Sequence, residues 1–225
     1  MEFNEIMKDL RNNANAANVA GMARFGINSE GTLGISIPLL RSLAKKIGKD
    51  HALALRLWET EIHEARILAS MIDDPAAVSV AQMDSWARDF DSWDVCDQVC
   101  GNLFDKTRFA RQKAVLWAGQ KQEFVRRAGY TLMAVLAWHD KLAADALFLA
   151  YLDIIERGAD DERNFVKKAV NWALRNIGKR NRTLHKAAIA RARRIARQES
   201  RTARWIAADA LRELTSPKII ARIKT

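Results

Sequence analysis

One segment of this sequence places an aromatic ring and a carboxylate one helical turn apart. Trp93 and Asp97 are followed at the same spacing by Gly101, beside an apolar face made of Cys96, Val99, Cys100 and Leu103. A carboxylate next to an indole can stabilise developing positive charge or orient a water molecule. The alternative is that Asp97 is an ordinary solvated side chain. A second alternative is a negative charge favoured near the start of a helix. This alternative explains Asp94, in the first turn, better than it explains Asp97.

A second segment, 161–177, places a tryptophan inside a row of cations. Trp172 recurs at helical spacing with Lys168, Arg175 and Lys179, and the opposite side of the segment is apolar: Val166, Val170, Ala173 and Ile177. Cations hold phosphates, and a flat ring meets a sugar or a base. The alternative is that Trp172 packs against a neighbouring helix, because the helices of a solenoid bury two faces.

A third segment, 183–198, carries a purely basic stripe. Lys186, Arg193 and Arg197 share one side, and the stripe has no Asn or Gln to read base edges. We expect it to contact a phosphate backbone without sequence preference. The remaining tryptophans stand beside apolar neighbours and are predicted to lie in the core: Trp58, Trp86, Trp117, Trp138 and Trp205.

Helical patterns cover most of the chain and position these residues. Ser36 and Pro38 begin a helix that Gly48 ends, and a second helix runs through Leu55 and Trp58. The Gly-containing stretch 26–35 is predicted to be a plain connection. Further amphipathic helices are expected over 61–72, 79–90, 92–104, 107–119, 122–138, 140–157, 161–177, 183–198, 200–214 and 216–224.

These helices predict an all-α fold in one domain, 1–225. Ten glycines and three prolines are too few for the frequent turns of a β-sandwich or barrel, and no run is apolar enough for a membrane helix. Helix pairs that recur about every 30–40 residues favour an α-solenoid, a superhelix of HEAT-like helical repeats with a concave basic face. A globular helical bundle is the competing architecture.

Charge is distributed unevenly along the chain, whose net charge is +10. Residues 163–225 hold 18 Lys and Arg against 3 Asp and Glu, whereas residues 1–162 hold 19 against 24. Such a basic third predicts a polyanion-binding surface; well-solvated helices are the alternative. The acidic, mixed start favours a cytoplasmic, nucleoid-associated protein. Two cysteines, scattered histidines and unsuitably spaced acids predict no metal and no cofactor.

Three blocks of the sequence resemble the DNA alkylation repair enzyme family, the HEAT-repeat alkylpurine DNA glycosylases. They are Ser92–Asp97 (SWDVCD), Phe124–Ala128 (FVRRA) and Phe165–Arg175 (FVKKAVNWALR), with looser matches at 22–25 and 33–35. The resemblance covers most of the chain. Members of the family usually carry an aromatic hydroxyl and a lysine where this chain has Phe25 and Gly26, so the resemblance does not extend to an N-terminal phosphate contact.

The resemblance implies a monomer that binds double-stranded DNA containing alkylated purines. The implied reaction is hydrolysis of the N-glycosidic bond of N3- or N7-alkylated purines, as in base excision repair. By the motifs, Trp93 and Trp172 would contact the sugar, Asp97 would be the catalytic carboxylate, and Arg127 and Arg175 would bind the phosphate backbone.

A non-catalytic HEAT-repeat scaffold that binds DNA structures or another protein is the alternative. The residues favour the enzyme, because a carboxylate that faces a phosphodiester backbone would only repel it in a pure binder.

Overall fold

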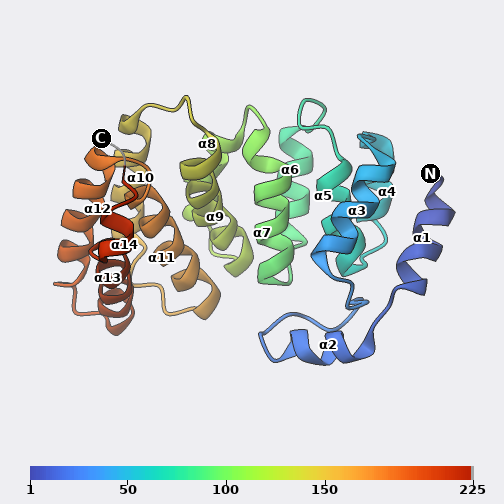
Figure 1. Ribbon diagram of the computed structural model, residues 1–225, viewed down its shortest axis with the longest axis horizontal. Coiled ribbons are helices and arrows are strands. Elements are labelled where there is room, and N and C mark those ends of the chain that lie inside the picture. Colours follow the sequence, from blue (N-terminus) through green and yellow to red (C-terminus); the bar gives the residue numbers. More distant parts are fainter. Residues whose placement is uncertain (224–225) are drawn as a thin grey trace. The chain divides into compact units, whose positions relative to one another are not determined.

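The computed structural model describes residues 1–223, and helices form the framework of this part of the chain (Figure 1). No strand occurs among the residues described. The chain divides into two compact units, Met1–Arg108 and the part from Phe109 onward. Among the described helices, none combines the length and apolar character that crossing a membrane requires.

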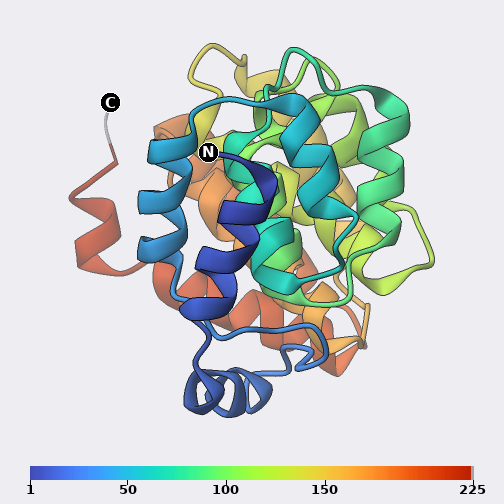
Figure 2. The same cartoon turned by 90° about the vertical axis from the view of Figure 1, so that its right-hand side faces the viewer.

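The first unit contains seven α-helices and a short 3-10 helix. In chain order these are α1 (Phe3–Asn12), α2 (Ala16–Ala23), α3 (Ile37–Ile47), α4 (His51–Trp58), α5 (His63–Ile72), α6 (Val80–Arg88), α7 (Trp93–Asn102) and η1 (Phe104–Lys106). Helix α5 packs against α3, α4 and α7. Trp58 and Trp86 stack in the core with ring centroids 3.9 Å apart. In Figures 1 and 2, α2 lies beyond the ends of the other helices of its unit, and none of its residues is buried.

A buried carboxylate holds the connection between α2 and α3. Both oxygens of Glu64 accept backbone N–H groups, from Leu33 at 2.8 Å, Gly34 at 2.6 Å and Ile35 at 3.1 Å. Gly34 has a φ of +78°, and a Cβ atom there would stand 2.3 Å from the carbonyl oxygen of Asn15. The connection predicted over 26–35 is therefore pinned to α5 rather than loose.

The second unit forms two layers. One layer contains α9 (Glu123–His139), α11 (Asn164–Gly178) and α13 (Arg201–Leu214), and the other contains α8 (Ala110–Ala118), α10 (Asp145–Arg157) and α12 (Arg182–Ile195). The short α14 (Pro217–Ile220) follows α13. Helix α9 is buried from Val125 to Ala137 except at Arg126. Gly129 permits its close approach to α8, because a Cβ there would lie 2.3 Å from the backbone nitrogen of Ala118.

Hydrogen bonds between successive helix pairs show the repeat spacing. In the first unit, Trp58 bonds Asp89 and His63 bonds Asp94, each 31 residues apart. In the second unit, Asn171 bonds Asp209 over 38 residues, and Arg180 bonds the Ala137 carbonyl over 43. These separations bracket the length of common helical-pair repeats. The all-α, HEAT-like fold expected from the sequence is confirmed.

Two of the five tryptophans predicted to lie in the core do not. Trp58, Trp86 and Trp117 are buried, but Trp138 is 59% exposed and Trp205 is 44% exposed. Trp138 lies on the last turn of α9, beyond its buried stretch. Trp205 lies on α13 with the Lys167 ammonium 5.5 Å from its ring centroid. Apolar neighbours along the sequence do not reveal either position.

Several element boundaries also differ from the predicted ones. Helices α1 and α2 were not among the predicted segments. Helix α10 begins at Asp145, later than the predicted 140, and α14 ends at Ile220, although the pattern predicted 216–224. Residue 224 lies outside the described residues. The single domain expected over 1–225 stays a prediction.

Candidate functional site

Helix α7 presents Trp93 and Asp97 on the side away from the core. Cys96, Val99, Cys100 and Leu103 are buried, whereas Trp93 and Asp97 are half-buried, so the predicted apolar face is confirmed. The indole Nε1 of Trp93 donates to the carbonyl oxygen of Phe25 at 3.1 Å. This bond fixes the ring against the α2–α3 connection, where the Phe25 side chain is 73% exposed.

The start of α7 is tied to two other parts of the first unit. The Ser92 hydroxyl accepts a hydrogen bond from the backbone N–H of Asn28 at 2.8 Å. The Asp91 carboxylate accepts a hydrogen bond from the side-chain amide of Asn28, also at 2.8 Å. Asp94 bonds Nε2 of His63 on α5 at 2.8 Å. Asp94 is therefore more than the helix-start charge expected from the sequence. His63, its partner, positions the start of α7, and the sequence pattern did not single out this histidine.

The environment of His63 favours its protonated form. Burial of the ring lowers its pKa, but the hydrogen bond and charge of Asp94, together with Glu64 and Asp91, outweigh burial and leave the pKa raised. The Asp94 carboxylate thus holds a histidine that carries positive charge more readily than usual. Asp94 connects α7 to α5 and thereby sets where Trp93 and Asp97 stand.

The two cysteines behind this surface are not candidate nucleophiles. Cys96 and Cys100 are both buried, and no disulfide joins them. Burial, with further contributions from Cys96, Asp97 and Asp105, raises the pKa of the Cys100 thiol well above its ordinary value. A protonated, buried thiol is a poor nucleophile and a poor metal ligand. Within the described part of the chain, no group of three or more His, Cys, Asp and Glu side chains is arranged to hold a metal ion.

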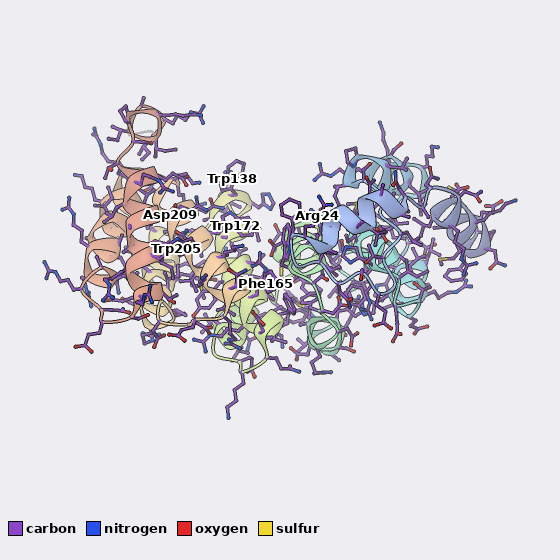
Figure 3. The ribbon with its side chains drawn as sticks, turned by 90° about the horizontal axis from the view of Figure 1, so that it is seen from below. Arg24, Trp138, Phe165, Trp172, Trp205 and Asp209 are labelled. Carbon is purple, nitrogen blue, oxygen red and sulfur yellow. The ribbon has the colours of Figure 1, made fainter. Side chains whose placement is uncertain are left out.

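Helix α11 carries Trp172 and Lys168 on the side opposite its core, as predicted. Val166, Val170, Ala173 and Ile177 are fully buried, whereas Trp172 is half-buried and Lys168 is exposed. Figure 3 labels Trp172 together with Trp138 and Trp205, one tryptophan from each helix of the α9–α11–α13 layer. Each helix of this layer therefore contributes an indole that is at least partly exposed.

Two cations of the predicted basic stripe are paired with carboxylates of α13. Arg175 and Lys179 both bond Glu213, at 2.5 Å and 2.7 Å, and Arg175 lies 3.7 Å from Asp209. Burial raises the pKa of Glu213, but the hydrogen bond from Lys179 and the nearby charges outweigh burial and leave the pKa lowered. A phosphate that binds Arg175 or Lys179 must therefore compete with an ionised carboxylate.

Arg127, the expected phosphate ligand, is almost completely buried. The residue is 5% exposed, and its Nη1 donates to the carbonyl oxygen of Phe165 at 2.6 Å. The rings of Phe124 on α9 and Phe165 on α11 also contact each other, with centroids 5.5 Å apart. The structure thus gives Arg127 a role in joining α9 to α11. Its role toward DNA stays a prediction.

The basic stripe of α12 lies in the other layer of the second unit. Lys186, Arg193 and Arg197 are exposed; the first two lie on α12, which packs beside α10, and Arg197 follows its end, although the predicted helix ran to 198. Lys168, Trp172 and Arg175 lie on α11, and Lys179 directly follows it. Two further arginines of α12 pair with α10: Arg191 bonds Asp153 and Glu156, and Arg194 bonds Glu156 at 3.0 Å. The two basic stripes predicted from the sequence therefore lie in different layers of the second unit, and their role toward DNA stays a prediction.

Comparison with known proteins gives the family. The family model of the DNA alkylation repair enzyme matches residues 6–214, and the chain belongs to this family. The fold is similar to one solved structure with a TM-score of 0.79 and 20% sequence identity, and the match covers 95% of this chain and 95% of the other. That protein is described as one of a new family related to the HEAT-like repeat DNA glycosylases, with affinity for branched DNA structures. No curated protein gives a significant match.

Proposed function

We propose that this protein is a DNA glycosylase that releases N3- or N7-alkylated purines from duplex DNA. One observation carries the proposal. In a chain of this family, α7 holds Asp97 one turn after Trp93, both half-buried on the side away from the core. A partly shielded carboxylate next to an indole suits a reaction that develops positive charge on a sugar.

The chemistry asks little of the protein beyond charge stabilisation. Alkylation at N3 or N7 makes the purine cationic, so it leaves with the electrons of the glycosidic bond as a neutral base. Asp97 stabilises the oxocarbenium-like sugar and directs a water oxygen to the anomeric carbon, and a proton of that water passes to the carboxylate or to solvent. Trp93, fixed by its bond to Phe25, offers its ring face to the cationic sugar, and Trp172 is a second indole proposed for this role.

Binding to the DNA backbone would come from exposed cations. Lys168 is exposed beside Trp172, and the C-terminal part of the chain carries a large excess of basic residues. Because phosphate contacts release counterions, binding of this kind is strong at low salt and independent of sequence. We also propose that the protein acts as a monomer at the nucleoid.

The test is release of free base. The purified protein is incubated with methylated duplex DNA, and free methyladenine and methylguanine are measured by mass spectrometry. Cationic purines leave DNA slowly without an enzyme, so this spontaneous loss is the background rate. We expect release well above that rate, because Asp97 stabilises the positive charge that develops on the sugar. Release at the spontaneous rate, with duplex binding intact, would overturn the glycosylase proposal and leave DNA binding alone.

A second candidate function is binding to branched DNA without catalysis. The solved relative is described as having affinity for branched DNA structures, and Arg175 and Lys179 of this chain are already engaged by Glu213. A binder would prefer a four-way junction over a linear duplex of equal length and would release no base. Comparing the two affinities with the excision assay distinguishes the candidates.

A further inference from the structure

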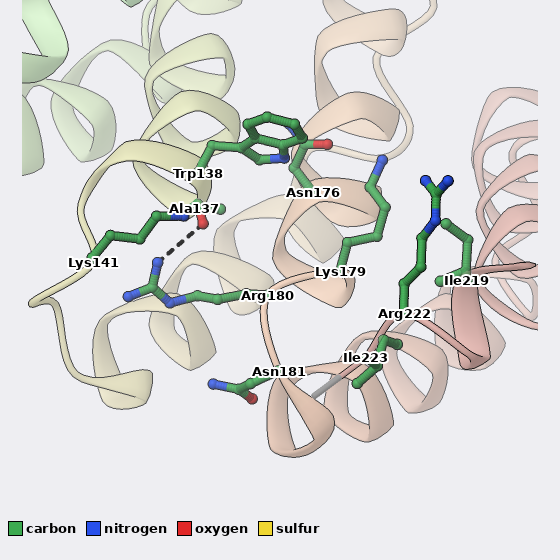
Figure 4. Close-up of a pocket in the computed structure, with 10 residues that line it drawn as sticks. All are labelled: Ala137, Trp138, Lys141, Asn176, Lys179, Arg180, Asn181, Ile219, Arg222 and Ile223. Carbon is green, nitrogen blue, oxygen red and sulfur yellow. Dashed lines mark hydrogen bonds between the residues drawn. The ribbon is translucent and has the colours of Figure 1, made fainter. Parts of the chain in front are cut away.

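A basic pocket opens at the C-terminal ends of α9 and α11 in the second unit (Figure 4). Its volume is about 500 Å³, and its wall includes the indole of Trp138, which is 59% exposed. Ile219 and Arg222 close the pocket from the side of α14. None of its residues belongs to the α7 surface described above.

The pocket wall is strongly cationic. Lys141, Lys179, Arg180 and Arg222 line it, and none of its described lining residues is acidic. Arg180 is locked in place, because its guanidinium donates to the carbonyl oxygens of Ala137 at 3.0 Å, Asp140 at 2.7 Å and Ala143 at 3.1 Å. Among the described residues, no ion pair between Arg180 and a carboxylate accompanies these bonds.

Lys179 reaches the same opening from α11. Its ammonium bonds Glu213 at 2.7 Å, and an ammonium has two further N–H groups to offer. Figure 4 shows the Lys179 side chain extending toward the opening where Trp138 lies. The pocket therefore combines an open ring face with several cations at its margin.

We propose that this pocket binds an unpaired nucleotide of DNA, with the base against Trp138 and its phosphate between Lys141, Lys179 and Arg222. The inference rests on the proposed DNA binding. Bases inside a duplex have both faces covered by their neighbours, so an exposed indole can stack only on a base that has left the duplex. Lys141 and Arg222 supply the wall's charge beside Lys179, whose ammonium Glu213 already engages, and this excess of cations favours the phosphate.

The experiment compares a blunt duplex with the same duplex carrying a single-stranded tail. A fluorescent base analogue in the tail, which dims when it stacks, reports contact with the indole. We expect the wild-type protein to bind the tailed DNA about tenfold more tightly, in line with one stacked base. Trp138→Ala should abolish that preference and the dimming but leave affinity for blunt duplex unchanged.

Matched controls separate the pocket from general charge and aromaticity. Trp205→Ala removes another exposed indole of the same layer and should keep the tail preference. Arg222→Ala should weaken tail binding more than Arg193→Ala, because Arg193 is an exposed cation outside the pocket.

Each contrary outcome has a distinct meaning. Equal wild-type affinity for tailed and blunt DNA, or a preference that survives Trp138→Ala, overturns the pocket proposal while duplex binding stands. Tail binding without blunt-duplex binding overturns the proposed duplex function instead. Displacement of the tail by an acidic peptide at the same charge concentration would show a general polyanion site and also overturn the nucleotide proposal.

Discussion

Asp97 and Asp94 are two carboxylates three residues apart on one helix with different surroundings. Asp94 is used to hold α7 against His63 of α5. Asp97 lies one turn after Trp93, on the half-buried side of the helix. The catalytic role proposed for Asp97 and the positioning role of Asp94 therefore lead to opposite expectations for their variants.

Replacing Asp97 tests the chemistry directly. We expect Asp97→Asn to fold, to bind duplex DNA at least as well as the wild type, and to release base roughly 10²-fold more slowly, because a charge-stabilising carboxylate is lost. Single-turnover excision and duplex affinity on the same preparations check this. Asp153→Asn, a largely exposed carboxylate on α10, is the matched control and should keep the rate. Full activity in Asp97→Asn rejects the proposed catalytic group.

Trp172 and Trp117 form a second comparison. Trp117 is buried, and truncation of a buried Trp to Ala costs about 3–5 kcal/mol. Trp172 is half-buried, so Trp172→Ala should cost well under half of that and lose most of its excision activity. Denaturant midpoints and single-turnover rates decide. If Trp172→Ala unfolds like Trp117→Ala and keeps its rate when folded, Trp172 is a core residue.

The raised pKa of His63 makes stability depend on pH. A histidine whose pKa is higher in the folded state stabilises the fold fully below its unfolded pKa of about 6.5, and this contribution disappears as pH rises through the folded pKa. We expect the free energy of unfolding of the wild type to exceed that of His63→Gln by more at pH 6 than at pH 9.

Asp94→Asn is the control for this pH effect. The variant removes the hydrogen-bonded charge that raises the His63 pKa most, and Glu64 and Asp91 remain, so in its background the pH-dependent part of the His63→Gln effect should shrink. Parallel stability curves for wild type and His63→Gln between these pH values would show that the His63–Asp94 bond does not favour the charged ring.

At the scale of the helix, the two basic stripes lead to different expectations for how DNA affinity depends on salt. Lys168 lies on α11 beside Trp172, whereas Arg193 lies on α12 in the other layer and Arg197 directly after the end of α12. If the α11 layer faces DNA, Lys168→Ala should reduce the slope of log affinity against log salt by about 0.9. The double variant Arg193→Ala, Arg197→Ala should then leave the slope unchanged.

The same measurement can favour the other layer. A slope that falls by about two units in the double variant and stays constant in Lys168→Ala places the phosphate contacts on α12. Both sets of side chains are exposed, so neither variant is expected to unfold the protein.

The helices were predictable where their signals are local. Ser36, Pro38 and Gly48 bound a predicted helix, and α3 runs from Ile37 to Ile47. The apolar faces of α7 and α11 followed from helical spacing alone. The pairing of Arg175 with Glu213 was not predictable, because it depends on the register between helices 38 residues apart, and degenerate repeats do not show that register.

Exposure at helix ends was equally hidden from the sequence. Trp138 follows a long apolar run, yet the run is covered and the last turn is not. Neighbouring helices, not neighbouring residues, decide where such a run leaves the core. The best candidate for a further binding site therefore came from a tryptophan that the sequence assigned to the core.

At the scale of the whole chain, the uneven charge agrees with the family, whose members are DNA alkylation repair enzymes. Only three acidic residues interrupt the basic segment 163–225, and two of them, Asp209 and Glu213, contact α11. These carboxylates keep α13 bound to α11 despite the surrounding positive charge. Exposed side chains such as Lys168 and Arg193 therefore carry the net positive charge of this segment.

The bonds between successive helix pairs also limit how such a chain can grow. In the first unit, Trp58–Asp89 and His63–Asp94 join residues 31 positions apart, whereas Asn171–Asp209 and Arg175–Glu213 span 38. A tandem duplication keeps donors and acceptors in register only when the copied segment is as long as the separation between the bonded residues in that part of the chain. Added helix pairs would therefore come in steps of 31 residues in the first unit and of 38 residues between α11 and α13.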